Sequence, residues 1–222
     1  MFASVAQRYD LLNHLLSFNI DRRWRRRTVE RVESVLTRPG ARVLDLCCGT
    51  GDLTLALEAR RGAGVWGSDF CHPMLAIAAG KIARKGSNSV FLEADALRLP
   101  LPDASVDLIT VAFGFRNLAN YQAGLAEMVR VLRPGGTAAI LEFSQPRQKV
   151  FAALYGFYSR RLLPAIGGAL SGSAEAYSYL PESVRRFPGA EELANAMREG
   201  GFRQVTFERM TGGIVALHLG TT

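Results

Sequence analysis

The chain alternates between short continuous apolar runs and stretches in which apolar residues recur at helical spacing. The short runs are bounded by polar residues and glycines, and they predict five strands. These strands cover about 41–48, 63–69, 89–94, 106–113 and 137–143. Residues 1–37 and the stretches between the strands carry the helical spacing. The helices between strands are expected at about 52–60, 73–85 and 121–132.

This order of elements predicts one α/β domain over residues 1–222, built on a parallel sheet with right-handed crossovers. With 48% apolar residues, a chain of this length can bury one full core. A sharp turn is expected at 133–136, before the fifth strand. Near the end, the runs 202–208 and 214–219 flank a Thr-Gly-Gly turn, which is typical of a β-hairpin. A mostly parallel sheet closed by an antiparallel hairpin resembles the Rossmann-like, seven-stranded fold of class I methyltransferases.

The first strand ends in a glycine turn, Gly49-Thr50-Gly51, that leads into a helix. Glycine lets the backbone approach a ligand closely, because no Cβ intervenes. A dinucleotide fingerprint would place a third glycine where this chain has Thr54. Asp52 puts a negative charge where a pyrophosphate would meet the helix, which favours a ligand that carries an amine. As a single residue, Asp52 is explained more simply as a helix cap.

Acidic residues accompany the first three strands. Asp45 precedes the glycine turn and is assigned to the cofactor site, although it could simply hold the turn by accepting backbone N–H bonds. Asp69 ends the second strand roughly 20 residues after the turn, where an acid can accept hydrogen bonds from both ribose hydroxyls. Asp95 follows the third strand and could meet an adenine amino group. Three acids without a phosphate cradle predict S-adenosylmethionine as the cofactor. Three residues beside these strand ends complete the predicted cofactor site: Phe70, Ala96 and Ala112.

Composition excludes several other classes of protein. No apolar run reaches about 18 residues, so no membrane span is predicted. Residues 1–8 lack the apolar core of a signal peptide. The cysteines, Cys47, Cys48 and Cys71, have neither disulfide nor metal-ligand spacing, so no metal site is predicted. They are typical of small buried residues in a reducing compartment, and the cytoplasm is the expected location.

Part of the net charge of +7 is concentrated in an arginine cluster at residues 22–27, which contains Trp24. Basic clusters attract anionic surfaces, either nucleic acid or lipid head groups. Trp24 favours the lipid interface, because an indole sits well at head-group depth. The cluster therefore predicts a transient contact at the inner face of a membrane, and no nucleic-acid partner. A solvated helix face explains the same cluster about as well.

The chain is expected to divide into four parts along this single domain: a helical cap (1–37), a cofactor-binding core (38–143), an insertion (144–188), and a C-terminal helix with the hairpin (189–222). The insertion is rich in aromatic and small residues. At the carboxyl edge of the sheet it could form a substrate lid over the crevice. The alternative is a pair of helices that packs these aromatics on the core.

Three blocks of sequence are more specific than the turns described above. They are Arg-Tyr-Asp at 8–10, Phe-Gly-Phe-Arg-Asn at 113–117 and Thr-Gly-Gly-Ile-Val-Ala at 211–216. With them, the chain resembles the ubiquinone/menaquinone biosynthesis C-methyltransferase family over essentially its whole length. This resemblance implies the class I S-adenosylmethionine-dependent methyltransferase fold. The chain departs from the family pattern at 71–75, where Cys-His-Pro-Met-Leu replaces the usual Ser-x-x-Met-Leu, and at Ala112, where some relatives carry serine.

The resemblance also implies a reaction, the C-methylation of a prenylated quinol. Demethylmenaquinol is the expected substrate, and 2-polyprenyl-6-methoxy-1,4-benzoquinol of ubiquinone biosynthesis is the alternative. A quinone ring carbon is electron-poor, whereas the reduced quinol can attack a methyl group, particularly after a hydroxyl loses its proton. An RNA methyltransferase and a non-catalytic scaffold of a quinone-synthesis complex are weaker alternatives. A homo-oligomer or quinone-synthesis partners are left open.

The resemblance places the catalytic candidates near the end of the fourth strand. Arg116 is expected to stabilise a developing phenolate or to position a water that takes the proton, and Asn117 to bond a quinol hydroxyl. In the family, a tyrosine like Tyr9 lies against the substrate. The structural alternatives are an ion pair with a nearby acid for Arg116 and a capping or docking contact for Tyr9. His218, in the last strand, is expected to be a core residue and not a base.

Overall fold

The computed structural model describes residues 14, 17–146, 156 and 181–222. The strands are β1 (Val43–Leu46), β2 (Trp66–Asp69), β3 (Val90–Glu93), β4 (Val106–Ala112), β5 (Leu132–Phe143), β6 (Arg203–Met210) and β7 (Val215–Thr221). The α-helices include α2 (Ile20–Leu36), α3 (Asp52–Arg61), α4 (His72–Lys85), α5 (Tyr121–Val131) and α9 (Ala190–Glu199). The 3-10 helices in the described residues are η1 (Phe115–Asn117) and η3 (Thr211–Gly213).

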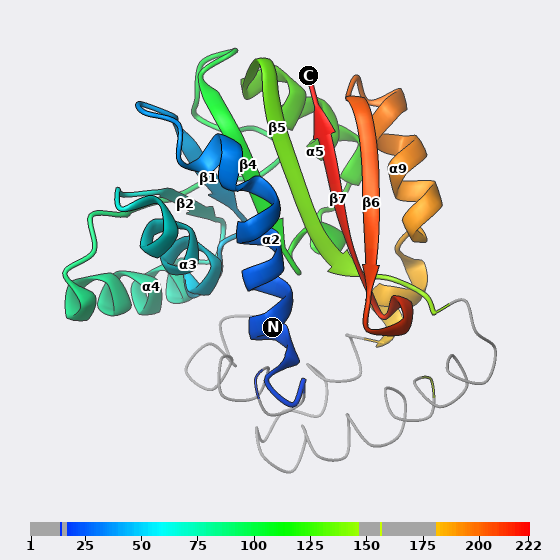
Figure 1. Cartoon of the computed structure of the whole chain (residues 1–222), viewed down its shortest axis with the longest axis horizontal. Helices are drawn as coiled ribbons and strands as arrows, with labels where there is room; N and C mark the ends of the chain where they lie inside the picture. Colours follow the sequence, from blue (N-terminus) through cyan, green and yellow to red (C-terminus); the bar gives the residue numbers. More distant parts are fainter. Residues whose placement is uncertain (1–13, 15–16, 147–155, 157–180) are drawn as a thin grey trace.

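The strands form one seven-stranded sheet in the order β3-β2-β1-β4-β5-β7-β6 (Figure 1). Strands β1 to β5 pair in parallel, whereas β7 runs antiparallel to both β5 and β6. The predicted parallel sheet with a terminal hairpin is confirmed. The strand order reverses between β1 and β4, and such a switch point opens a crevice at the carboxyl ends of the strands.

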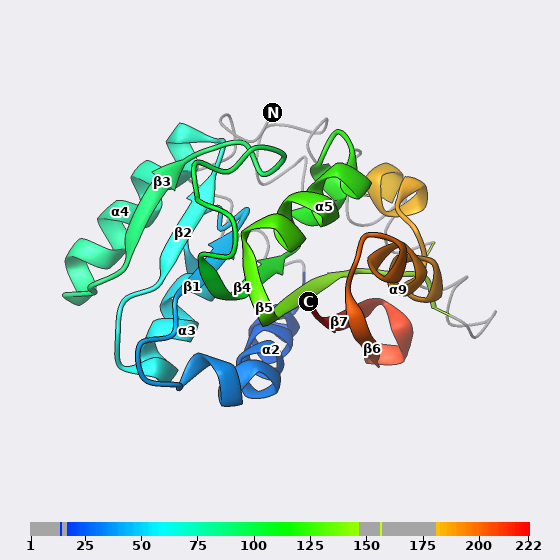
Figure 2. The same cartoon turned by 90° about the horizontal axis from the view of Figure 1, so that it is seen from above.

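Helices cover both faces of the sheet (Figure 2). Helices α2 and α3 pack on one face, and α5 and α9 pack on the other, each pair closing its own apolar cluster. Strand β1 is buried at all four positions, because it lies between these two layers. The turn that follows β1 therefore starts from a rigid base. None of the described helices is long and apolar enough to cross a lipid bilayer.

The fifth strand begins earlier than its pattern predicts. Strand β5 covers Leu132–Phe143, so the turn expected at 133–136 lies inside the strand. Its pairing with β4 shifts register at this point, as in a β-bulge. Gly135 has a φ of 76° and donates its N–H to the carbonyl of Thr222 (3.0 Å). The predicted turn is therefore a bulge within β5 that is hydrogen-bonded to the C-terminal residue, and it does not separate α5 from the strand.

Trp24, on α2, is a core residue with only 6% of its surface exposed. Its indole N–H donates to Oγ1 of Thr211 (2.9 Å), and its ring packs against Phe113 and Phe143. A buried indole needs such a partner for its N–H group. The expectation that Trp24 lies at a lipid interface is wrong. The residue instead joins α2 to the turn of the hairpin.

The three cysteines are free thiols, half-buried at Cys47 and Cys48 and buried at Cys71. Burial raises the pKa of the Cys47 and Cys48 thiols, with further effects from nearby carboxylates such as Asp45 and Asp69. These thiols therefore stay protonated at neutral pH. Cys71 is thus the small buried residue that its sequence context predicts, whereas Cys47 and Cys48 are only partly buried.

Candidate active site

The glycine turn after β1 lies at the switch point of the sheet. The N–H of Cys48 donates to the carbonyl of Ser68 (2.9 Å), which ties the turn to β2. Gly49 and Gly51 have φ values of 55° and 82°, in the left-handed region that favours glycine. A Cβ added at Gly49 would meet no atom within 4 Å. This part of the turn is open, and its backbone can be approached closely by a ligand.

Asp69, the last residue of β2, lies against this turn. Its Oδ2 accepts the N–H of Gly49 (2.9 Å), and its Oδ1 accepts the N–H of Cys71 (2.9 Å). Burial raises the pKa of the Asp69 carboxyl, although these backbone bonds oppose the rise. The next residue, Phe70, is 63% exposed and offers an aromatic surface beside the carboxylate. An acid for ribose hydroxyls beside a ring for a purine fits the adenosine part of S-adenosylmethionine.

The end of β3 brings further predicted residues to the same edge. The N–H of Ala94 donates to the carbonyl of Asp69 (3.1 Å), which places Asp95 just beyond the paired strands. Asp95 is exposed and Ala96 is buried. Ala112, half-buried, is the last residue of β4. The strand ends are thus brought together as predicted, while contacts of Asp95, Ala96 and Ala112 with the cofactor stay a prediction.

Asp45 lies behind the turn, with 1% of its surface exposed. Its two carboxylate oxygens accept the hydroxyls of Thr54 (2.7 Å) and Thr110 (2.9 Å), which both lie outside the glycine turn. Burial raises the pKa of Asp45 to about 6, against the two hydroxyl bonds. The side chain therefore links β1, α3 and β4 beneath the crevice. Direct contact of Asp45 with the cofactor stays a prediction.

Asp52 is the first residue of α3, and Gly51 occupies the cap position, so the expectation that Asp52 caps the helix is wrong. Its carboxylate accepts from Nζ of Lys81 (2.6 Å) and lies 3.4 Å from Nε2 of His14. Lys81 also donates to Oγ1 of Thr50 (3.0 Å). Burial raises the pKa of Asp52, but the hydrogen bond from Lys81 and nearby positive charges lower it overall. The negative charge expected to meet a ligand amine is therefore shared with Lys81.

Arg116 lies in η1, directly after β4, and forms a buried ion pair with Glu142 of β5. Its Nη1 donates to Oε1 of Glu142 (2.8 Å) and to the carbonyl of Phe113, and its backbone N–H donates to Oε2 of Glu142 (3.2 Å). The two side chains are 7% and 1% exposed. The guanidinium carbon also lies 5.2 Å from the centre of the Phe143 ring. The structural ion pair considered for Arg116 is therefore present.

The same arginine reaches the end of the predicted insertion, 144–188. Its Nε donates to Oγ of Ser183 (3.3 Å), and no described residue accepts a hydrogen bond from its Nη2. Asn117, the next residue, is half-buried, and its N–H donates to the carbonyl of Gly114 (3.0 Å). Tyr9 and most of the insertion lie outside the described residues, so the predicted roles of cap and lid stay predictions.

Two residues of this site, Glu142 and Lys81, were missed by sequence reasoning. Glu142 carried a signal, because it is the only charged residue in the apolar run 137–143 and a buried carboxylate requires a partner. Lys81 carried none, because its contact with the turn depends on how α4 packs. His218 is buried as predicted, and its Nε2 lies 2.8 Å from the carbonyl of Ala190.

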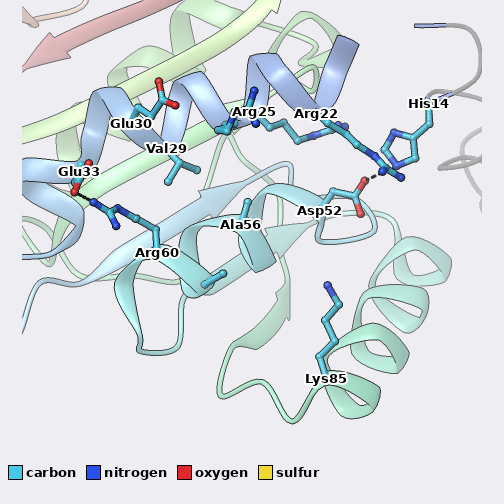
Figure 3. Close-up of a pocket in the computed structure, with 12 residues that line it drawn as sticks. His14, Arg22, Arg25, Val29, Glu30, Glu33, Asp52, Ala56, Arg60 and Lys85 are labelled. Atoms are coloured by element: carbon cyan, nitrogen blue, oxygen red, sulfur yellow. Dashed lines mark hydrogen bonds and ion pairs between the residues drawn. The ribbon is translucent and has the colours of Figure 1, made fainter. Parts of the chain in front are cut away.

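A groove of about 850 Å³ runs between α2 and α3 beside the glycine turn (Figure 3). Its lining is strongly charged, with Arg22, Arg25 and Arg26 on the side of α2, and Asp52 and Arg60 on the side of α3. Sites for apolar ligands are lined mainly by hydrophobic side chains. The groove therefore does not suit an isoprenoid tail.

The model of the ubiE/COQ5 methyltransferase family matches residues 1–222. The chain is 51% identical to demethylmenaquinone methyltransferase of Thermus thermophilus, with 99% of each chain covered. It is 43% identical to the ubiquinone/menaquinone biosynthesis C-methyltransferase UbiE of Shewanella pealeana, covering 99% of this chain and 88% of that one.

Among solved structures, a SAM-dependent methyltransferase from Thermotoga maritima superposes with a TM-score of 0.70 at 18% identity, covering 99% of this chain and 97% of that one. One from Aquifex aeolicus gives 0.63 at 22% identity, covering 87% and 88%. These likenesses confirm the class I methyltransferase fold. From its full-length match and its relatives, the chain belongs to the ubiE/COQ5 methyltransferase family.

Proposed function

We propose that the protein transfers the methyl group of S-adenosylmethionine to a ring carbon of demethylmenaquinol and forms menaquinol. Relatives that are 51% and 48% identical are named demethylmenaquinone methyltransferases, whereas the UbiE proteins, named for both quinones, are 42–43% identical. This difference supports the naphthoquinol over the methoxy-benzoquinol. The observation that carries the proposal is Arg116, held at the crevice edge within the family-specific block 113–117.

The reaction forms a bond between the quinol ring carbon and the methyl carbon and breaks the bond from methyl to sulfur. S-adenosylmethionine supplies the methyl group as a sulfonium. The ring carbon then loses its hydrogen as a proton, so one proton leaves in the balanced reaction. Deprotonation of the neighbouring hydroxyl feeds charge into the ring and makes the carbon nucleophilic. The protein must therefore stabilise a quinolate oxygen and align the two reactants. Alignment alone can account for about 7–11 kcal/mol of a barrier.

Arg116 is the residue that we assign to the quinolate oxygen. Nη1 and Nε are engaged by Glu142, Phe113 and Ser183, so the guanidinium is held in one orientation. Nη2 can then donate to a substrate oxygen. A preorganised cation in a water-poor site stabilises developing negative charge without reorganising during the reaction. Asn117 is assigned to the quinol hydroxyl, and Tyr9 of the cap to the opposite side of the substrate.

Glu142 acts in this proposal as a positioning residue. It accepts from both the side chain and the backbone of Arg116, so it fixes the guanidinium against the end of β4. The pair also neutralises a cation that would otherwise be buried at high cost. Glu142 thus allows an arginine to remain in the protein interior at the crevice.

The location follows from the substrate. A prenylated quinol stays in the bilayer, so we propose that the protein works in the cytoplasm at the inner face of a membrane. The insertion 144–188 and the cap 1–37 would supply the apolar cover for the tail. The charged groove between α2 and α3 does not offer such a cover.

The proposal is tested by mass spectrometry of quinols incubated with the protein, S-adenosylmethionine and a reductant. Demethylmenaquinol and the methoxy-benzoquinol are offered side by side. We expect a gain of about 14 Da, one methyl for one hydrogen, on demethylmenaquinol and only in the presence of reductant. A gain on the benzoquinol alone would assign the protein to the ubiquinone pathway. No gain on either, with S-adenosylmethionine still bound, would contradict quinol methylation.

Asp69→Ala tests the cofactor site in the same assay. The variant should bind S-adenosylmethionine at least about 10-fold more weakly, since it loses the half-buried carboxylate that we assign to the two ribose hydroxyls. Asp103→Ala is the matched control, because Asp103 is exposed and lies in an ion pair away from the crevice. If quinol methylation in cells requires the chain but survives Asp69→Ala, the scaffold alternative is favoured.

A further inference from the structure

The first two turns of α2 carry three exposed arginines: Arg22, Arg23 and Arg26. No carboxylate among the described residues pairs with them. Their neighbours differ, because Arg25 pairs with Asp21 and Arg27 pairs with Glu208. Residues three and four apart are neighbours on a helix surface, so the three arginines form one contiguous face. We call Arg22, Arg23 and Arg26 the arginine face.

A large aromatic residue stands directly before this face. Phe18 is 74% exposed, more than any other large apolar residue in the described part of the chain. Phe18 and Asn19 both have left-handed φ values, 52° and 58°, which are uncommon for residues with a side chain. The turn is closed by the N–H of Asn19, which donates to the carbonyl of His14 (2.7 Å). An exposed phenyl ring therefore lies beside three cations at the start of α2.

The groove extends this positive surface toward the active site. Arg22 and Arg26 line it. The acids that share it already have cationic partners, because Glu33 pairs with Arg60 (Figure 3), Glu30 with Arg27 and Asp52 with Lys81. The unpaired arginines therefore leave it positively charged. Since Asp52 directly follows the glycine turn, the arginine face adjoins the cofactor crevice.

We propose that Phe18 and the arginine face dock the protein on an anionic lipid bilayer. The three guanidinium groups bind lipid phosphates, which planar guanidinium groups recognise with two parallel hydrogen bonds. The phenyl ring of Phe18 enters the head-group region, the place that Trp24 cannot take because it is buried. This inference deepens the proposed function, on which it rests, because it brings the crevice to the surface where a membrane-held quinol arrives.

The test is co-sedimentation of the full chain with vesicles. Vesicles of phosphatidylcholine alone are compared with vesicles that also contain phosphatidylglycerol. We expect binding to the anionic vesicles only, weakened by salt. Replacing all three arginines (Arg22→Glu, Arg23→Glu, Arg26→Glu) should weaken it on the order of 100-fold. Phe18→Ser should weaken it about 10-fold.

A charge-matched control separates the effect of the proposed surface on vesicle binding from the effect of the protein's net charge. The variant Arg38→Glu, Arg84→Glu, Arg203→Glu reverses three other exposed arginines that have no ion pair among the described residues. It should bind the anionic vesicles within about 3-fold of the parent chain. Equal loss in both triple variants would overturn the proposal, as would full binding by Phe18→Ser.

Methylation of a short-tailed, water-soluble quinol without vesicles keeps the two proposals distinguishable. The arginine-face variant should retain this activity, since none of its residues touches the reacting groups. If the parent chain methylates the soluble quinol but binds no vesicles, the docking proposal is overturned and the proposed function is unaffected. Single-stranded RNA, added at the same concentration of negative charge as the vesicles, provides a further comparison. If the RNA binds more tightly and displaces the vesicles, the arginine face is assigned to nucleic acid instead.

Discussion

Arg116 and the arginine face of α2 carry the same side chain into opposite surroundings. Arg116 is 7% exposed and paired with Glu142, which is 1% exposed. Arg22 and Arg23 are exposed, and no described carboxylate pairs with them. A buried guanidinium requires a carboxylate, because leaving a charge unpaired in the interior is costly. An exposed one is solvated by water, so its charge remains available to a partner.

The comparison shows how burial changes the purpose of a charge. At the crevice, Glu142 makes Arg116 a fixed group with a set direction. On the arginine face, solvation leaves the side chains adaptable, which suits a fluid surface such as a lipid head-group layer. A cluster of arginines in the sequence is therefore less informative than the depth at which each side chain lies.

The largest effect is expected from breaking the buried pair. Glu142→Gln leaves Arg116 without a counter-charge, and the free energy of unfolding should fall by about 3 kcal/mol, measured by urea denaturation. Quinol methylation at saturating substrate should fall on the order of 100-fold, since the guanidinium loses its fixed direction.

A merely structural role for Glu142 would leave the pH dependence of kcat unchanged in the molecules that remain folded. In a positioning role, loss of the negative charge makes the surroundings of the quinol hydroxyl more positive. The pH at which kcat reaches half its maximum should then move to lower values. An unchanged pH profile with an unchanged KM would contradict the positioning role.

A second buried carboxylate, Asp45, forms no ion pair within the described part of the chain and sharpens the comparison. Burial raises its pKa to about 6, compared with 3.8 for an unburied aspartate, so the folded chain holds this proton more tightly than the unfolded chain. The stability contributed by the protonated form is complete below about pH 4. It is lost as the pH rises through 6, by roughly 3 kcal/mol.

Asp45→Asn removes this titration. The free energy of unfolding of the variant, relative to the parent chain, should therefore rise between pH 4 and pH 7 by roughly the same 3 kcal/mol. Denaturation curves taken at both pH values measure the difference. Parallel pH dependences of the two chains would show that Asp45 does not titrate in this range.

The smallest effect is expected at an exposed pair. Glu208 accepts from Arg27 through both carboxylate oxygens (3.0 Å each), but the two side chains are 35% and 41% exposed. Glu208→Gln should cost less than about 1 kcal/mol and leave methylation unchanged, because water screens the interaction. It is the same acid-to-amide change as Glu142→Gln. If Glu208→Gln and Glu142→Gln lower the free energy of unfolding equally, burial does not explain the importance of the Arg116–Glu142 pair.

Much of the fold was predictable because its signals are local. An apolar run in a buried strand, a glycine turn and a helical period can each be recognised without knowing their neighbours. The glycine turn and Asp69 could be placed at one crevice because parallel strands end at a common edge. The predicted start of β5 was wrong, because the bulge at Gly135 is held by a hydrogen bond to the carbonyl of Thr222, which lies far along the chain.

The errors and omissions at the site have a similar cause. Trp24 is indistinguishable from an interfacial residue until the hairpin turn supplies Thr211 to its N–H group. Asp52 looks like a cap until the structure places Gly51 at the cap position, and its contact with Lys81 depends on how α4 packs. The roles of Arg116 and Asn117 came from a family resemblance and not from any local rule.

The sequence by itself determined the sheet, the order of its strands along the chain, and the residue types at the crevice. These depend on periodicity and on turn chemistry, which act over a few residues. The tertiary structure decided which charges are paired, as for Arg116 with Glu142, and which remain exposed, as for Arg22. That division depends on burial and on partners distant in the chain, because the free energy of a charge is set by its surroundings and not by its position in the sequence.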